Sequence, residues 1–427
     1  MDNSLLGVHL KELVTNHAVP GAQFAVYHGG ETWTWTYGET RAGSGTPMTD
    51  GSPVPVGSIT KVVTAAAALV LVGDDDLELD EPLVDVVPEL RDLPRRLTLR
   101  HVLSHTGGLP CDPTDVRAVT SRRYVQDCCR AAESLADPGS IFSYSNIGYL
   151  LAGHAITTIT GMSWWEAVQA LVLDPAGVPA RFVTGSRVPA DLVTGHSGRG
   201  RPVVQALTAA QAATGALAAS ATDLVNLGRG LLTTVLDREA ADQMCTPVPG
   251  ADPFGLADGW GLGLATYGAG RTVGHDGNGD GTSCHLRMNR DTGTVVALTT
   301  NSGAGFVLWR ELARRLPECG LPIDDYDPLA VSGRPIAAPD GCVGDYANGD
   351  LEYTVRHNVV GGFRLTVDDE PFADLTVHSG HRFTMRDTDT GVTDQAGRFV
   401  VEDGHVTGIQ VGGRLARKQL ERALLVG

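Results

Sequence analysis

The chain has 427 residues, of which 42% are hydrophobic and 19% are charged. This length and composition are typical of a globular protein with two or three structural units. The 33 basic and 50 acidic residues give a net charge of −17, so nucleic acid is not expected as a partner. No run of about twenty apolar residues occurs in the sequence, so we expect no membrane association.

The cysteine pattern and the first residues both favour a cytoplasmic protein. Seven cysteines at irregular spacing predict free thiols in a reducing compartment, because a secreted disulfide framework normally uses an even set. Residues 5–14 interleave apolar side chains with His9, Lys11 and Glu12. This pattern predicts an amphipathic helix and not a secretion signal.

The first 316 residues predict a sheet built from both ends of a domain, with a mostly helical insertion between them. A β-hairpin is expected at 20–40, followed by an almost wholly apolar helix from Ser58 to residue 72. Apolar periodicity between Gly, Pro and Asp breaks predicts the later elements. These are helices at 98–104, 121–134, 146–159, 163–173, 205–218, 221–235 and 304–316, and strands at 260–267, 284–288 and 294–300.

The pattern changes beyond a stretch at 317–340 that is rich in proline and glycine and is typical of a linker. Six short alternating runs follow, which predict a small antiparallel barrel or sandwich. They lie at 351–357, 362–367, 373–378, 382–387, 398–402 and 406–411. We therefore expect a first domain at 1–325 (its helical part at about 80–250), a linker at 326–340 and a β domain at 341–427.

Ser58 and Lys61 are the first candidates for chemistry. Positions three apart share one face of a helix, so the lysine amine should lie over the serine hydroxyl. A partly desolvated lysine can lose its proton near neutral pH and act as a base. The alternative is that Ser58 only caps the helix and Lys61 is solvated. The helix has almost no polar face, which favours a buried lysine and a serine nucleophile.

Tyr144 and Asn146 form the second candidate group, just before a predicted helix. In a catalytic role, a Tyr144 phenolate stabilised by Lys61 would shuttle the proton of Ser58 and of the leaving group. Asn146 would hold a substrate amide and the lysine. The alternatives are that Asn146 caps the helix and that Tyr144 only packs.

His275, Gly277 and Asn278 form the third group, within an expected edge strand. A glycine there lets a substrate backbone approach closely. His275, as a cation or as a hydrogen-bonding group, could bind a carboxylate or hold the oxygen of Tyr144. The N–H groups of Ser58 and Asn278 are candidates for an oxyanion hole. Residues 276–281 also match half of a calcium loop, but the position of its bidentate Glu holds an Arg, so calcium is rejected.

In the order S-x-x-K, Y-x-N and H-x-G, these motifs resemble those of the penicillin-recognising serine enzymes, specifically the class C β-lactamase, DD-carboxypeptidase and D-aminopeptidase group. The resemblance covers about residues 5–316. It implies an α/β, β-lactamase/transpeptidase-like domain, in which helices flank an antiparallel sheet and a helical subdomain is added. It also implies acylation of Ser58, with no cofactor and no metal. His275 replaces the lysine of the frequent Lys-Thr-Gly motif, as in the esterase, aminopeptidase and cyclase branches, and this disfavours β-lactam hydrolysis.

One branch of that group consists of stand-alone thioesterases that cyclise peptides released from nonribosomal assembly lines. Its members carry His-x-Gly and a C-terminal lipocalin-like β domain. This resemblance implies off-loading and head-to-tail macrocyclisation of a peptidyl thioester, with the substrate delivered by a carrier protein. The alternatives are a cytosolic esterase or a D-amino-acid-specific amidase or peptidase of the same fold. A non-catalytic peptide-binding protein is the alternative from another class, and the oligomeric state stays open.

Overall fold

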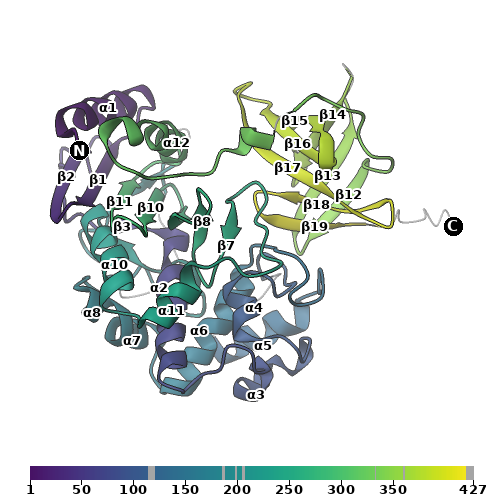
Figure 1. Cartoon of the computed structure of the whole chain (residues 1–427), viewed down its shortest axis with the longest axis horizontal. Coiled ribbons are helices and arrows are strands. Elements are labelled where there is room, and N and C mark those ends of the chain that lie inside the picture. The colour runs from purple at the N-terminus through teal and green to yellow at the C-terminus, as the bar shows by residue number, and fades with distance from the viewer. Residues whose placement is uncertain are drawn as a thin grey trace.

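The computed structural model describes residues 1–113, 121–184, 188–197, 200–203, 207–331, 333–358 and 361–419. A helix-flanked sheet lies above a helical region, and a β-barrel stands beside both of them (Figure 1). The predicted α/β domain with an all-β C-terminal domain is therefore confirmed. No helix among the described residues is long and apolar enough to cross a lipid bilayer.

The main sheet has seven antiparallel strands in the order β2-β1-β11-β10-β9-β8-β7, so both ends of the domain contribute to it. The predicted N-terminal hairpin is confirmed, with Phe24 opposite Trp35. Strand β1 then pairs with β11, which places Ala25 opposite Ala297. The strands are β1 Gly21–His28, β2 Glu31–Gly38, β7 Gly259–Trp260, β8 Ala265–Tyr267, β9 Thr272–Gly277, β10 Ser283–Asn289 and β11 Val295–Thr300.

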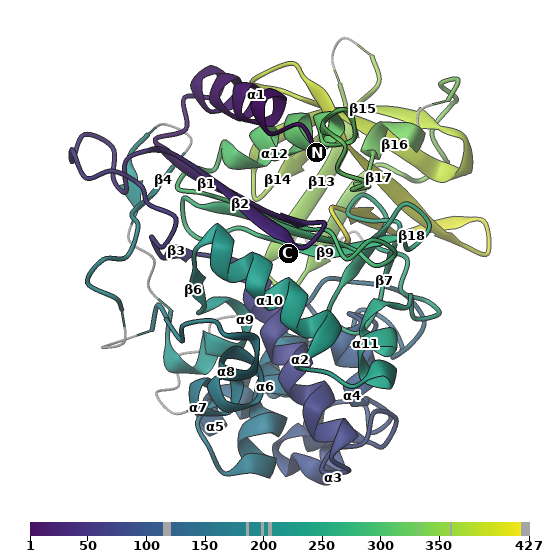
Figure 2. The same cartoon turned by 60° about the vertical axis from the view of Figure 1, so that its left-hand side comes forward.

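Both faces of this sheet are buried because its side chains alternate between two hydrophobic cores. Phe24 and Val26 pack with α1 (Asn3–Asn16) and α12 (Gly305–Arg315) on one face. Ala25 belongs to the other core, which contains α2 and α10 (Ala221–Thr233). Figure 2 shows these two helical layers above and below the strands.

The helical region is built around α2 (Thr60–Gly73), which follows a single 3-10 turn, η1 (Gly57–Ile59). Its sequence offers no polar face, and most of its residues are buried by neighbouring helices. The other elements of this region are α3 Leu83–Val86, η2 Pro88–Asp92, α4 Leu99–Leu103, α5 Ser121–Ala131, α6 Asn146–Thr160, α7 Trp164–Val168, the π-helical η3 Gln169–Leu173, α8 Asp174–Ala176, η5 Ala209–Gln211, α9 Ala212–Gly215 and α11 Arg238–Cys245.

Two of the expected elements are wrong in form. The helix expected at 205–218 begins outside the described residues; its described part holds only η5 and α9, and then forms β6 (Ala218–Ala219). This strand pairs with β3 (Val54–Pro55), directly before the turn that carries Ser58. The single strand expected at 260–267 is a hairpin of β7 and β8. Gly263 turns the chain with φ +101°, at a place where a Cβ would lie 2.4 Å from that of Ala65.

The C-terminal domain is a closed eight-stranded antiparallel barrel with its own hydrophobic core. Strands β12 and β19, which the sequence pattern did not predict, close it by pairing Tyr346 with Lys418. Closure leaves no free sheet edge. Its strands are β12 Gly344–Asn348, β13 Leu351–His357, β14 Phe363–Val367, β15 Glu370–His378, β16 Arg382–Asp387, β17 Thr393–Glu402, β18 His405–Val411 and β19 Arg414–Lys418. The other described elements are the short strands β4 Gly195–His196 and β5 Pro202–Val203, which pair with each other. The 3-10 turns η6 Pro317–Cys319, η7 Pro328–Val331 and η8 Ser379–His381 lie along the C-terminal third.

The β18–β19 hairpin of the barrel packs against the first domain beside Tyr144. The Tyr144 N–H donates to the Gly413 carbonyl at 2.9 Å, and the Gly413 N–H donates to the Phe254 carbonyl at 3.2 Å. Buried Gln410 donates its Nε2 to the Phe142 carbonyl at 3.2 Å. These bonds satisfy backbone groups that the contact removes from water, and they fix the hairpin beside Tyr144.

Candidate active site

Ser58 and Lys61 lie as their spacing predicts. The Lys61 Nζ donates to the Ser58 Oγ at 3.0 Å and to the Thr214 carbonyl at 2.9 Å. The Lys61 side chain is 0% exposed, and this burial lowers its pKa to about 7. Lys61 can therefore be neutral near pH 7 and take the proton of the Ser58 hydroxyl.

Tyr144 completes a cluster of three polar groups. Its hydroxyl is hydrogen-bonded to the Ser58 side chain, and its ring centroid lies 5.2 Å from the Lys61 Nζ. Burial raises the pKa of Tyr144, and this outweighs the opposite effect of the Ser58 hydrogen bond. The resting side chain is thus a phenol, and the expected phenolate is wrong for this state.

Aromatic rings hold Tyr144 from behind. His105 stacks on it with ring centroids 4.2 Å apart, and Trp260 meets it edge-on at 5.9 Å. The His105 Nδ1 accepts a hydrogen bond from the Ser145 N–H at 3.1 Å, which fixes the orientation of its ring. Trp260 was expected as part of a strand and was assigned no role in the site.

Asn146 lies in the first turn of α6 and faces the same pocket. Its Nδ2 donates to the Asp112 Oδ1 at 2.5 Å, whereas the described bonds of Lys61 go to Ser58 and Thr214. The expected contact between Asn146 and the lysine is not observed. The helix cap is Ser145, whose Oγ accepts from the Gly148 N–H at 3.2 Å, so the capping role expected for Asn146 is wrong.

His275 reaches the pocket from β9. This strand lies between β10 and β8, but its pairing with β8 stops at Gly274, so only the His275–Gly277 end behaves as the predicted edge. The His275 Nδ1 contacts the Asp276 carbonyl at 2.6 Å and must carry the proton, which leaves Nε2 buried, as an acceptor without a protein partner. Burial and the nearby Lys61 lower the pKa of His275 to about 4. His275 is therefore neutral at neutral pH, and the expectation that it acts there as a cation is wrong.

Two glycines bring the end of β9 against the Ser58 turn. A Cβ on Gly277 would lie 1.9 Å from the Val56 carbonyl oxygen, and one on Gly57 would lie 2.5 Å from the Asn278 carbonyl. Gly57 also has φ +52°, a conformation that favours glycine. The backbone segments that contain the Ser58 and Asn278 N–H groups thus lie side by side, as an oxyanion hole requires.

These side chains line a cavity of about 260 Å³, to which the barrel also contributes. Gly412 and Arg414 come from the β18–β19 hairpin. Arg414 donates its Nε to the Cys111 Sγ at 3.0 Å and lies 5.4 Å from the Tyr144 ring centroid. Arg414 is not among the residues that the sequence predicts for the site, and the only local signal is the pair of glycines that precede it.

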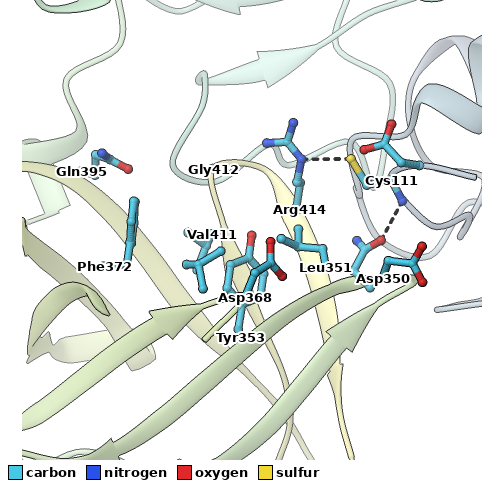
Figure 3. Close-up of a pocket in the computed structure, with 13 residues that line it drawn as sticks. Cys111, Asp350, Leu351, Tyr353, Asp368, Phe372, Gln395, Val411, Gly412 and Arg414 are labelled. Atoms are coloured by element: carbon cyan, nitrogen blue, oxygen red, sulfur yellow. Dashed lines mark hydrogen bonds between the residues drawn. The ribbon is translucent and has the colours of Figure 1, made fainter. Parts of the chain in front are cut away.

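A second cavity of about 500 Å³ shares Gly412 and Arg414 with the first (Figure 3). The barrel supplies most of its wall, with apolar side chains such as Leu351 and Phe372. Asp350 and Asp368 also line it. The active-site pocket therefore extends toward the mouth of the barrel.

In the segment that resembles half of a calcium loop, the first carboxylate is already bound by other side chains of the protein. The Asp276 carboxylate accepts hydrogen bonds from His285 and Arg287. Burial alone would raise the pKa of Asp276, but these partners outweigh it and hold the pKa below its ordinary value. Within the described part of the chain there is no group of three or more side chains that could hold a metal ion.

Fold and site together define a serine enzyme of the β-lactamase class, with an added C-terminal barrel. Residues 9–316 match the family model described as Beta-lactamase, which covers well over half of the chain. The chain belongs to this family, whose members are serine hydrolases. The predicted membership of the penicillin-recognising group is confirmed.

Individual relatives match about three quarters of the chain or nearly all of it. It is 29% identical to Penicillin-binding protein 4 of Amycolatopsis lactamdurans over 75% of this chain and 93% of that one. The crystal structure of SurE is similar over 97% of this chain and 98% of that one, at 37% identity and a TM-score of 0.84. SurE has also been solved with D-Leu. A D-stereospecific amidohydrolase from Streptomyces sp. is 25% identical, covers 75% of this chain and 99% of that one, and has a TM-score of 0.60.

Proposed function

We propose that the chain releases a nonribosomal peptidyl thioester as a head-to-tail macrocycle, through an acyl enzyme on Ser58. The observation that carries the acyl-transfer part is the buried Lys61 Nζ, 3.0 Å from the Ser58 Oγ. The group that would orient an amine as acyl acceptor is His275, whose free Nε2 lies in the same pocket and can only accept a hydrogen bond.

In the first step, neutral Lys61 takes the proton of Ser58 while the Oγ attacks the thioester carbonyl. The N–H groups of Ser58 and Asn278 stabilise the oxyanion. The C–S bond then breaks, and the thiolate leaves with a proton that Tyr144 relays from Lys61. The acyl group is now an ester of Ser58, and Lys61 is neutral again.

In the second step, the N-terminal amine of the same peptide attacks the Ser58 ester. An uncharged amine donates one N–H to the His275 Nε2, which orients its lone pair toward the carbonyl. Lys61 takes the proton lost by the amine and returns it to the Ser58 Oγ as the ester bond breaks. A cationic residue in the place of His275 would instead attract the carboxylate of a linear peptide.

The barrel supports cyclisation over hydrolysis in this proposal. Its hairpin covers Tyr144, which limits the access of water to the acyl enzyme. The cavity toward the barrel gives room for the body of a folded-back peptide. The similarity to SurE along almost the whole chain, and the D-Leu of one SurE structure, support a D-residue at the acyl end. A carrier protein in the cytoplasm would deliver the thioester.

The test uses peptidyl N-acetylcysteamine thioesters whose C-terminal residue is D-Leu or L-Leu. The D-peptide should give a macrocycle at the expense of the linear acid, and the L-peptide should react slowly. A fluorophosphonate should add mass to the wild type but not to Ser58→Ala. An adduct that persists in the variant would refute Ser58 as nucleophile, and linear acid from every substrate would refute cyclisation.

A D-amino-acid-specific amidase or a related esterase is the second candidate, favoured by the similarity to the D-stereospecific amidohydrolase. It predicts release of D-Leu from D-leucinamide, or of acid from short esters, at rates above those for the peptidyl thioesters. A non-catalytic peptide-binding protein predicts no adduct at Ser58 with any acyl probe. The same panel of substrates and probes therefore separates all three functions.

A further inference from the structure

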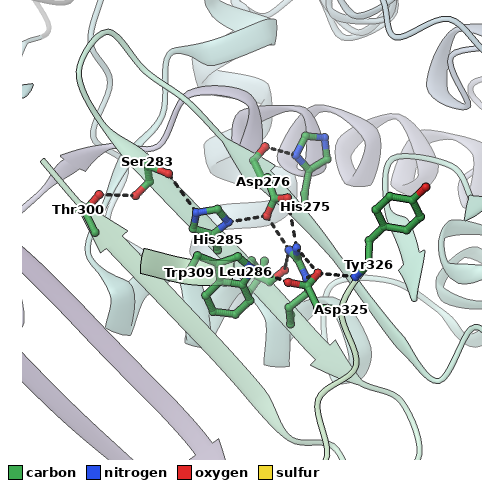
Figure 4. Close-up of polar contacts among 10 residues, drawn as sticks. His275, Asp276, Ser283, His285, Leu286, Thr300, Trp309, Asp325 and Tyr326 are labelled. Atoms are coloured by element: carbon green, nitrogen blue, oxygen red, sulfur yellow. Dashed lines mark hydrogen bonds and ion pairs between the residues drawn. The ribbon is translucent and has the colours of Figure 1, made fainter. Parts of the chain in front are cut away.

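A buried polar network lies behind His275, on the face of the sheet that packs against Trp309 of α12 (Figure 4). Arg287 is its centre. One guanidinium nitrogen is 2.7 Å from the Asp276 Oδ1, and another is 2.9 Å from the Asp325 Oδ1. Asp276 follows His275 directly, whereas Asp325 belongs to the segment that leads to the barrel. A buried arginine therefore joins that segment to the His275 end of the active-site strand.

Aromatic side chains enclose this arginine, which is 1% exposed. Its guanidinium carbon lies 4.2 Å from the Tyr267 ring centroid and 5.2 Å from that of Trp309. The Trp309 Nε1 donates to the second oxygen of Asp325 at 2.7 Å. A charge in such a place is stable only with its partners, so loss of Asp325 would leave Arg287 under-satisfied and free to change its hold on Asp276.

The network reaches the chemistry through the main chain of Asp276. Its side chain is fixed by Arg287 and by the His285 Nδ1 at 2.7 Å. Its carbonyl oxygen contacts the His275 Nδ1 at 2.6 Å. The other nitrogen of a histidine is an acceptor only while this one keeps the proton. The placement of one carbonyl thus decides which nitrogen of His275 can accept a hydrogen bond in the pocket.

An alternative role for these residues is a second Ser-His-Asp triad. The Ser283 Oγ lies 3.0 Å from the His285 Nε2, and the His285 Nδ1 lies against Asp276. Ser283 and His285 are both 0% exposed, however. Ser283 lines neither of the two cavities that share Gly412 and Arg414. A nucleophile that no substrate can reach does no chemistry, so this arrangement is structural.

We propose that Asp325 is a positioning residue for His275. Through Arg287 and Asp276 it fixes the carbonyl that binds the Nδ1 proton of His275, and so keeps Nε2 an acceptor toward the acyl enzyme. The consequence for turnover rests on the proposed function, but the effect on the histidine tautomer does not. Asp325 also accepts from the Tyr326 N–H at 3.0 Å, and the Tyr326 hydroxyl accepts from the Gly255 N–H at 3.1 Å. These two bonds tie it to the loop beside the barrel.

The test compares Asp325→Asn with Asp324→Asn as a matched control. Asp324 is the adjacent carboxylate, and it pairs at 2.9 Å with an Arg271 whose side chain is 57% exposed. Long-range ¹H–¹⁵N spectra of ¹⁵N-histidine protein report the tautomer, and His275→Gln assigns the signal of His275. Acylation by a fluorophosphonate and the macrocycle-to-acid ratio are measured on the same samples.

The Asp325→Asn protein should lose the pure Nδ1–H signal of His275. Its macrocycle-to-acid ratio should fall about tenfold, while fluorophosphonate acylation stays within about twofold, and Asp324→Asn should match the wild type in all three. If Asp325→Asn does not fold, Trp309→Phe takes its place in the test. This variant removes one hydrogen-bond donor to Asp325 and should shift the His275 tautomer in the same direction. An unchanged tautomer in a folded Asp325 or Trp309 variant, or an equal change in Asp324→Asn, would overturn the proposal. A shifted tautomer in an enzyme that forms no macrocycle would instead refute only the proposed function.

Discussion

Acylation of Ser58 should increase with pH along a limb centred near pH 7, because the base is the neutral amine of Lys61. Burial lowers the pKa of this amine to about 7. The neutral fraction is then about one in eleven at pH 6 and about ten in eleven at pH 8. The acylation rate should therefore rise about tenfold between these two pH values and level off above them.

The assay is a single-turnover measurement with a fluorescent penicillin or an activated ester, from about pH 4 to pH 9. Arg414→Gln removes a cation that lowers the pKa of Lys61, so its limb should move to higher pH. Arg356→Gln is the control, since Arg356 pairs with an exposed Asp345 on the barrel. A limb near pH 4 would instead assign the base to His275, whose pKa is lowered to about 4. A flat profile would refute the argument.

Three further predictions concern stability and geometry. The pKa of Lys61 falls from 10.5 to about 7 on folding; the unfolded chain then binds more protons between these pH values, so wild-type stability rises with pH across that window. Lys61→Met should thus raise the free energy of unfolding at pH 7 by up to about 4 kcal/mol and by little near pH 10.5. Urea titrations measure this free energy for the wild type and the variant at each pH. A difference between the two proteins that is the same at every pH would contradict the prediction. Gly277→Ala places a Cβ 1.9 Å from the Val56 oxygen and should slow acylation about 10²-fold or more; Gly51→Ala, which meets nothing within 4 Å, should not. Gln410→Leu leaves two carbonyls of the first domain without their donor and should lower the free energy of unfolding by about 1–3 kcal/mol. The loss should be seen as a lower Tm and as earlier proteolysis of the linker. An unchanged Tm would show that the Gln410 side chain does not hold the barrel in place.

Local patterns predicted the parts of the site that depend on one element. Ser58 and Lys61 are three residues apart, so their contact follows from helical geometry alone. Gly277 could be placed near the nucleophile because a glycine within a strand indicates a close approach of another backbone. The barrel strands β13 and β16 lie where their alternating pattern predicts them.

Contacts between distant segments could not be predicted in this way. Arg414 enters the pocket only because β19 closes the barrel and the barrel docks on Tyr144, and neither event leaves a periodic signal. In the sequence, Trp260 looks like an ordinary strand residue. In the structure, the glycines around it split that strand into a hairpin. The Asp112 partner of Asn146 lies far along the chain from it. Protonation states depend on burial, so the phenol of Tyr144 and the neutral His275 also required the structure.

The barrel lowers the pKa of the active-site lysine in addition to packing against the first domain. Burial lowers the pKa of Lys61 most, and Arg414 of the barrel lowers it further, whereas Cys111 and Asp112 raise it. A chain that ends before residue 336 would lose Arg414 and would expose Tyr144 to water, and both changes raise the pKa of Lys61. If circular dichroism shows such a chain to be folded, it should acylate slowly at pH 7 and recover as the pH rises. An unchanged limb would assign the barrel a role outside the site, such as association between chains, because a module that only joins chains leaves the proton affinity of a distant lysine unaltered.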